Sequence, residues 1–145
     1  MGNTEKQERY KLLMTKLNRA MQNEFWLEAC MIEYAIIEDR TSSILFYSGV
    51  SANAYDSSKK LSNKLNSIEY QIGKGHPVIS KKVDPETIDK IRKWKELRND
   101  FVHRSCVLYD EEKAKDLALQ GKALCKLISN DSQKVKRMIK KSEEK

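Results

Sequence analysis

The chain has 145 residues, of which 34% are charged and 39% hydrophobic, and its formal net charge at pH 7 is +7. This length and composition predict one soluble domain with a single hydrophobic core. No stretch approaches the roughly 18 consecutive apolar residues of a membrane span, and the polar N-terminus is unlike a secretory signal. We therefore expect a cytoplasmic protein without a membrane partner.

The excess of 28 basic over 21 acidic residues favours an anionic partner, with nucleic acid first. The alternative is that lysine-rich helices only keep a small protein soluble. Cys30, Cys106 and Cys125 stand far apart and form no C-x-x-C pair, which predicts reduced thiols. Neither histidine has a second His or Cys at ligand spacing, so we expect no metal site and no cofactor.

Apolar residues recur at helical spacing in residues 4–21 and again in residues 23–47, which predicts two amphipathic helices. In the second helix, Glu33 and Arg40 fall inside the apolar stripe. Charged side chains on a core face need partners, and these two are seven residues apart, so each should meet a group on another helix or another subunit. They either form a structural polar network or support an active site.

Residues 48–58 are small and polar and predict a loop, whereas residues 59–73 predict a third helix that Gly73 ends. Residues 73–83 predict a connector, because His76 precedes Pro77 and helix is disfavoured there. Its Lys81 and Lys82 are candidates for contact with RNA phosphates.

Residues 83–106 form the most informative segment. Asp84 predicts an N-cap and Pro85 suits the first helical position. One face of the helix is apolar and should lie in the core; its members are Ile91, Trp94, Leu97, Phe101 and Val102.

Arg98 falls about 40° from Trp94 on the helical wheel, and therefore on the apolar face. A guanidinium in that position should have an anionic partner. Asn99 precedes His103 by one helical turn and can reach its side chain. His76 is the less favoured of the two histidines as a functional residue.

The last helix should begin at the N-cap Asp110, with acidic residues first and basic residues later, and Gly121 within it suggests close packing against another helix. Residues 130–132 should break or bend this helix. The sequence therefore predicts one helical domain over residues 1–130. Residues 131–145 should form a basic C-terminal extension, either a short helix or a solvated tail.

The sequence LRNDFVH, residues 97–103, places Arg98 five residues before His103 with four residues between them, the first of which is the polar Asn99, near the end of a helix. It resembles the signature of the HEPN superfamily, small all-helical domains of which many are metal-independent ribonucleases. The resemblance implies an HEPN-like up-and-down bundle of four or five helices and a homodimer whose two Arg–His pairs share one cleft. Ser105 stands where members paired with a nucleotidyltransferase antitoxin often carry Tyr.

The chemistry of these side chains suits RNA cleavage. Histidine transfers protons near neutral pH, and arginine binds phosphate oxygens through its planar fork. The candidate catalytic residues are thus Arg98, His103 and Asn99, with Asn99 orienting His103 or binding phosphate. Candidate supports are Glu33 and Arg40, and the candidate RNA-binding residues are Lys95, Arg104, Lys81 and Lys82.

The predicted function is a metal-independent endoribonuclease that leaves a 2′,3′-cyclic phosphate. The HEPN resemblance further implies a toxin or phage-defence effector, with an antitoxin or regulatory protein as a possible partner. Two alternatives remain open. One is a non-catalytic helical module that binds RNA or protein, and the other is an HEPN-like partner protein that binds nucleotide.

Overall fold

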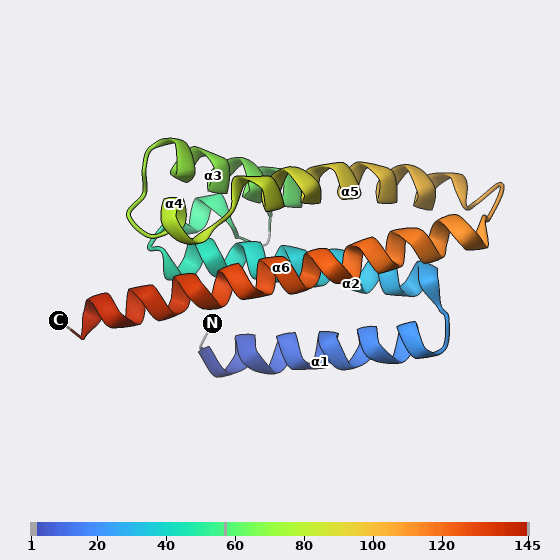
Figure 1. Cartoon of the computed structure of the whole chain (residues 1–145), viewed down its shortest axis with the longest axis horizontal. Helices are drawn as coiled ribbons and strands as arrows, with labels where there is room; N and C mark the ends of the chain where they lie inside the picture. Colours follow the sequence, from blue (N-terminus) through green and yellow to red (C-terminus); the bar gives the residue numbers. More distant parts are fainter. Residues whose placement is uncertain (1–2, 57, 145) are drawn as a thin grey trace.

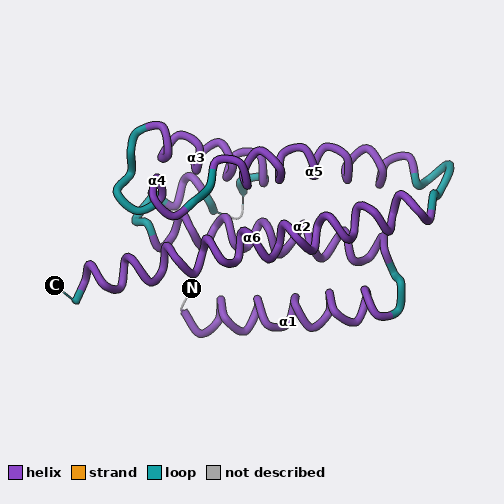
Figure 2. The backbone as a smooth tube through the Cα atoms, viewed as in Figure 1, coloured by secondary structure: helices purple, strands orange, loops and turns teal. Residues whose placement is uncertain are grey.

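A computed structural model of the chain describes residues 3–56 and 58–144. Within these residues it is all-helical, with no strand (Figure 2), as the sequence predicted. The elements are α1 (Asn3–Gln22), α2 (Trp26–Tyr47), the 3-10 helix η1 (Ala52–Ala54), α3 (Leu61–Gly73), α4 (Ile79–Lys82), α5 (Pro85–Arg104) and α6 (Glu111–Glu143).

Helix α2 lies in the middle of the molecule and packs against α1, α3, α5 and α6. The last turns of α6 lie at one end of the molecule, and the α1–α2 and α5–α6 connections lie at the other end (Figure 1). Buried residues on α2 include the adjacent pairs Ala29–Cys30 and Ile36–Ile37 and the run 43–45. Neighbouring positions on a helix point about 100° apart, so α2 is covered from more than one side. Among the described residues, no helix combines the length and apolar character needed to cross a bilayer.

The expected connector after α3 contains one unpredicted helical turn, α4. The described residues therefore form six α-helices rather than four or five. His76 organises this turn: its Nδ1 accepts hydrogen bonds from the amides of Val78 (3.1 Å) and Ile79 (3.2 Å), and its Nε2 lies 3.1 Å from the Ser48 carbonyl oxygen. A four-residue helix is too short for hydrophobic periodicity to reveal it.

Helix α3 ends at Gly73, as predicted, although the backbone turns at a later glycine. Lys74 caps the helix, and Gly75 takes the left-handed conformation with φ +73°. Glycine adopts that conformation without the steric cost of a Cβ atom.

The predicted break at residues 130–132 is wrong, because α6 runs unbroken for 33 residues. Asp131 and Ser132 are only 7% and 2% exposed, and Val135 is fully buried. Tyr10 of α1 donates a hydrogen bond to Ser129 Oγ at 3.0 Å, which helps hold α1 beside this part of α6. Tertiary packing thus outweighs the low helix propensity of these polar residues, and the expected boundary at residue 130 falls inside α6.

Gly121 marks the closest approach between α6 and its neighbours. A Cβ atom at this position would overlap the carboxyl group of Glu33 on α2 and would lie 2.7 Å from Trp94 Cζ2 on α5. Glycine is therefore required by space at the point where three helices meet.

We predict that Gly121→Ala lowers the free energy of unfolding. Overpacking costs about 1–3 kcal/mol, and the better helix propensity of alanine recovers only about 1 kcal/mol of it. Urea denaturation followed by circular dichroism measures the change. Gly73→Ala is the matched control, since a Cβ atom there meets nothing within 4 Å. A gain in stability for Gly121→Ala as large as that for Gly73→Ala would contradict the close contact.

Candidate functional site

Helix α5 carries the candidate residues and begins as predicted. The Asp84 carboxylate accepts a hydrogen bond from the Glu86 amide at 2.9 Å, and Pro85 is the first helical residue. The apolar face is partly as expected: Ile91, Trp94 and Phe101 are buried. Leu97, however, is 55% exposed, because no neighbouring helix covers its side of α5.

Lys95, Asn99 and His103 follow one another at intervals of four residues on α5 and therefore lie along one side of the helix. Asn99 and His103 are exposed and Lys95 is half-buried. Arg98 lies between this side and the core, and is also half-buried. The structure thus places the three candidate catalytic residues and Lys95 within the last three turns of one helix, accessible to a ligand.

The side chain of Arg98 contacts the aromatic ring of Tyr34 and the side-chain amide of Asn99. Its guanidinium carbon lies 4.5 Å from the centre of the Tyr34 ring on α2, and one terminal nitrogen donates a hydrogen bond to Asn99 Oδ1 at 2.9 Å. Its Nε is buried without a hydrogen-bond partner. The sequence predicted an anionic partner for Arg98, but no carboxylate among the described residues forms an ion pair with it. The cation therefore keeps hydrogen-bonding capacity for an external anion.

His103 lies in the last turn of α5 with an exposed side chain. Within residues 5–56 and 58–144, no hydrogen bond joins it to Asn99 or to any other side chain. Asn99 instead accepts the hydrogen bond from Arg98. In this structure Asn99 orients the arginine, and His103 is free to meet a substrate or a second protein.

Glu33 lies on the buried face of α2, where its side chain is 0% exposed. Neither carboxyl oxygen has a hydrogen-bond partner among the described residues. Burial raises the pKa of Glu33 to about 9, against a smaller opposing effect of Lys122. The carboxyl group is therefore protonated at neutral pH, which avoids the large cost of a buried unpaired charge.

Glu33 and Arg98 do not form an ion pair with each other, but both lie near Cys30. Burial raises the pKa of the Cys30 thiol to about 12, and the positive charge of Arg98 acts in the opposite direction. Glu33 thus lies close behind the Arg98 region, as an uncharged part of the core beneath it.

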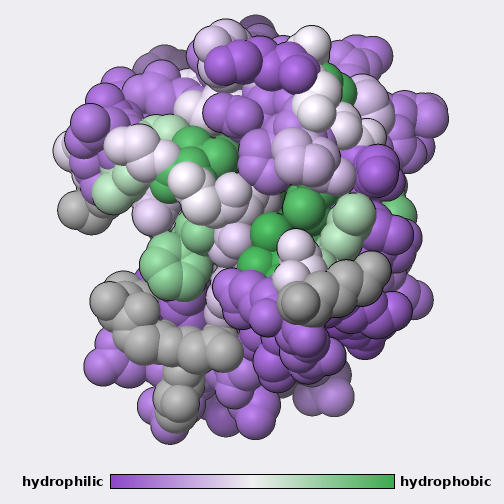
Figure 3. Space-filling view, turned by 90° about the vertical axis from the view of Figure 1, so that its left-hand side faces the viewer, coloured by the Kyte–Doolittle hydropathy of each residue, from purple (hydrophilic) through white to green (hydrophobic). Residues whose placement is uncertain are grey.

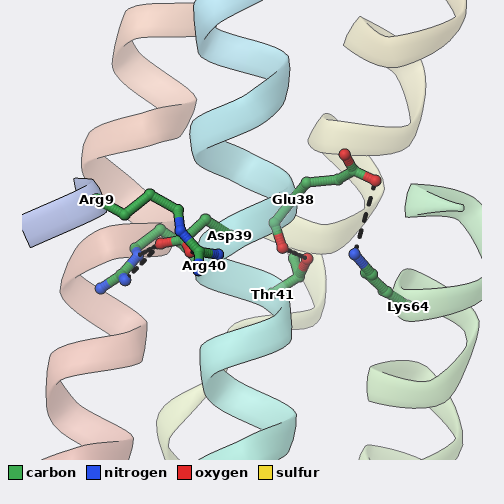
Figure 4. Close-up of polar contacts among 6 residues, drawn as sticks. All are labelled: Arg9, Glu38, Asp39, Arg40, Thr41 and Lys64. Atoms are coloured by element: carbon green, nitrogen blue, oxygen red, sulfur yellow. Dashed lines mark hydrogen bonds and ion pairs between the residues drawn. The ribbon is translucent and has the colours of Figure 1, made fainter. Parts of the chain in front are cut away.

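Arg40 belongs to a different region. It pairs with its neighbour Asp39 at 2.6 Å and stacks over the Tyr10 ring at 4.4 Å, and Arg9 lies 3.6 Å from the same carboxylate. Figure 4 draws the two ion pairs of Asp39 together with the neighbouring ion pair between α2 and α3; the residues are Arg9, Glu38, Asp39, Arg40, Thr41 and Lys64. Arg40 therefore joins α2 to α1, and the structure does not bring it to the Arg98 side chain.

The four candidate RNA-binding residues fall into two groups. Lys95 and Arg104 lie on α5 near His103, and Arg104 pairs with Asp100 at 3.2 Å. Lys81 and Lys82 lie on α4, at the opposite end of the molecule (Figure 1). The latter two cannot contact the same phosphate as Arg98.

Two features of the region were missed in the sequence. Tyr34 gave no signal, because a lone tyrosine in a long helix usually packs in the core. Val107 and Leu108, in the turn that follows α5, are 92% and 76% exposed. Consecutive apolar residues in a short link could have been recognised as an exposed surface next to His103.

Among the described residues, no three His, Cys, Asp or Glu side chains gather where they could hold a metal ion. Comparisons with models of protein families, with curated proteins and with solved structures found no match.

We predict that Glu33→Gln flattens the pH dependence of stability. Between the ordinary pKa of 4.5 and the folded-state pKa of about 9, the folded chain keeps a proton that the unfolded chain releases. The free energy of unfolding should therefore fall as pH rises through this window, by about 1.4 kcal/mol per pH unit. Glutamine cannot ionise, so this slope should disappear.

Urea denaturation at pH 5, 6, 7 and 8 measures the slope. Glu96→Gln on the exposed side of α5 is the control and should keep the slope of the unmodified protein. Parallel slopes for Glu33→Gln and the unmodified protein would show that Glu33 is ionised in the folded state.

Proposed function

We propose that the protein is a metal-independent endoribonuclease with an HEPN-like helical fold. The observation that carries this proposal is the state of Arg98. Its guanidinium is fixed by Tyr34 and Asn99, lacks a carboxylate partner among the described residues, and lies within two turns of the exposed His103. A positioned cation and an accessible imidazole near the same end of one helix suit phosphate chemistry.

In the proposed reaction, a histidine removes the proton from the ribose 2′-hydroxyl, and the 2′-oxygen attacks the adjacent phosphorus. The bond from phosphorus to the 5′-oxygen breaks, and that oxygen receives a proton from a second acid. Arg98 stabilises the negative charge on the phosphoryl oxygens, and Asn99 holds the plane of its guanidinium. The products are a 2′,3′-cyclic phosphate and a 5′-hydroxyl, and DNA is not a substrate because it lacks the 2′-hydroxyl.

One protomer offers one accessible histidine, whereas the reaction needs a base and an acid. We infer that two copies pair across a two-fold axis and place two Arg98–His103 sets in one cleft. The exposed apolar side chains around this end of α5 support the pairing, since Leu97, Val107 and Leu108 are 55%, 92% and 76% exposed. The HEPN resemblance extends the proposal to a cytoplasmic toxin or defence effector that an antitoxin or regulatory protein controls.

A non-catalytic RNA-binding module is the second candidate. It is favoured by the lack of any described side chain that fixes the orientation of the His103 ring. A catalytic histidine is normally oriented by a hydrogen-bond partner, which in the proposed dimer would have to come from the second copy.

We predict that the purified protein cleaves RNA in the presence of EDTA and that His103→Ala lowers the rate by about 10²–10⁴-fold, the usual contribution of general acid–base catalysis. Arg98→Ala should also suppress cleavage. Lys93→Ala, an exposed substitution on another side of α5, should retain full activity. Gel electrophoresis of labelled RNA gives the rate, and phosphatase treatment identifies the cyclic ends. Equal activity of His103→Ala and the unmodified protein would contradict the proposed catalytic role of His103.

We predict that Leu108→Glu converts a dimer into a monomer and abolishes cleavage, because a charged residue would be buried in the interface. Leu12→Glu on α1, where the leucine is 56% exposed, is the control and should leave the dimer intact. Sedimentation velocity measures the mass of each variant. A fully active monomer would contradict the shared site, although not the chemistry assigned to His103.

A further inference from the structure

A basic groove lies between α4 and the last turns of α6, at the end of the molecule where α6 finishes (Figure 1). It encloses about 510 Å³, and its lining residues are Lys82, Lys134, Arg137, Met138, Lys140, Lys141 and Glu144. Figure 3 views the molecule from this end and shows mostly hydrophilic side chains around a smaller hydrophobic area. Five of the seven lining side chains are cationic, and one is acidic.

The cations of the groove are not neutralised by ion pairs. In the part of the chain that the structure describes, no carboxylate lies within 4.0 Å of a charged nitrogen of any of the five. Asp131 lies near Lys134, and Glu144 lies on the groove itself, so they offset only part of the charge. Like charges this close repel one another within the Debye length of about 8 Å, and a bound polyanion would relieve that repulsion.

The groove is also fixed in shape. Because α6 continues past residue 130, Lys134, Arg137 and Lys141 lie along one side of a regular helix at intervals of three and four residues. The same segment is anchored by the fully buried Val135, with Met138 and Ile139 packed on the core. These cations therefore form a surface of defined geometry instead of a solvated tail.

We propose that this groove binds the phosphate backbone of RNA. Flexible lysine side chains and one arginine suit successive phosphates, and the half-buried Met138 offers an apolar contact for a ribose or base. A membrane surface fits less well, because helices that bind it expose large apolar side chains beside the basic ones. The proposal that the groove binds RNA does not depend on the proposed ribonuclease function.

The place of the groove in the molecule gives it a further role, which rests on the proposed ribonuclease function. Lys82 precedes α5, and His103 lies 18 residues beyond the first residue of that helix, or about 27 Å along its axis. A stacked strand with a rise of about 3.4 Å per nucleotide needs about eight nucleotides to cover that distance. The groove therefore acts as an anchor for RNA whose reactive phosphate lies about eight nucleotides away, and cleavage should require RNA of at least that length.

The test measures binding first, without cleavage. Protein carrying His103→Ala is titrated with a fluorescent RNA of 20 nucleotides, with and without the added substitutions Lys134→Gln, Arg137→Gln and Lys141→Gln. The groove substitutions should weaken binding about tenfold or more. They should also reduce the slope of log affinity against log salt by about 2, since each phosphate contact to single-stranded RNA contributes about 0.7.

The matched control carries Lys11→Gln, Lys16→Gln and Arg19→Gln on the exposed side of α1, which remove the same charge elsewhere. It should lose less than about threefold in affinity. Thermal melting checks that each variant folds, and Lys141→Gln alone should reduce the salt slope by about 0.7. Equal weakening by the groove and control substitutions would overturn the groove as a site, as would tight RNA binding by the groove variant. Vesicle binding through the groove, without RNA binding, would overturn the choice of RNA.

The anchoring role is tested with His103 restored, by comparing cleavage of RNA of 5 and 20 nucleotides. The unmodified protein should prefer the longer RNA by about tenfold or more, and the groove variant should lose that preference. If neither length is cleaved while groove-dependent binding persists, the ribonuclease proposal fails and the RNA site stands. If both lengths are cleaved equally, the anchoring role fails and the ribonuclease proposal stands.

Discussion

The contact of Glu33, Trp94 and Gly121 is the constraint on which the arrangement of the helices depends. It brings together α2, α5 and α6 at a point where only a glycine leaves enough room. The Trp94 indole also donates a hydrogen bond to the Leu117 carbonyl at 2.9 Å, so the same residue ties α5 to α6. The rotation of α5 about its axis is thereby fixed, and with it the direction in which Arg98 and His103 face.

The same region contains buried polar groups that lack hydrogen-bond partners among the described residues. The carboxyl group of Glu33 is buried with no hydrogen-bond partner among the described residues, and the Nε of Arg98 is likewise buried without a partner. A core selected only for stability would fill these positions with apolar groups, since each unsatisfied buried group costs about 1–3 kcal/mol. Local violations of this kind are typical of places where function constrains the sequence. They agree with the placing of the proposed site on this side of α5.

The sequence predicted those parts of the fold that depend on local chemistry. Asp84 and Asp110 both cap helices as expected, and the Asp110 carboxylate accepts a hydrogen bond from the Lys113 amide at 3.2 Å. The failures depend on distant neighbours. Leu97 is exposed because no helix covers it, and α6 continues through residues 130–132 because α1 and the start of α5 pack there. For the site, the sequence correctly predicted that Arg98, Asn99 and His103 lie on one helix. The contact between Arg98 and Tyr34 joins two helices and could not be predicted without the fold.

Helix α6 is about 50 Å long, from its 33 residues and a rise of about 1.5 Å each, and it connects the two ends of the molecule. Its first turn follows the apolar turn after His103, and its last turns line the basic groove. An insertion of one residue would rotate everything beyond it by about 100° and turn the groove cations toward the core or away from α4. The helix can therefore change length only by about seven or eleven residues at a time, the steps that restore the same face. Divergence of this chain should leave residues 111–143 free of single-residue insertions and deletions, even where its surface residues are freely exchanged.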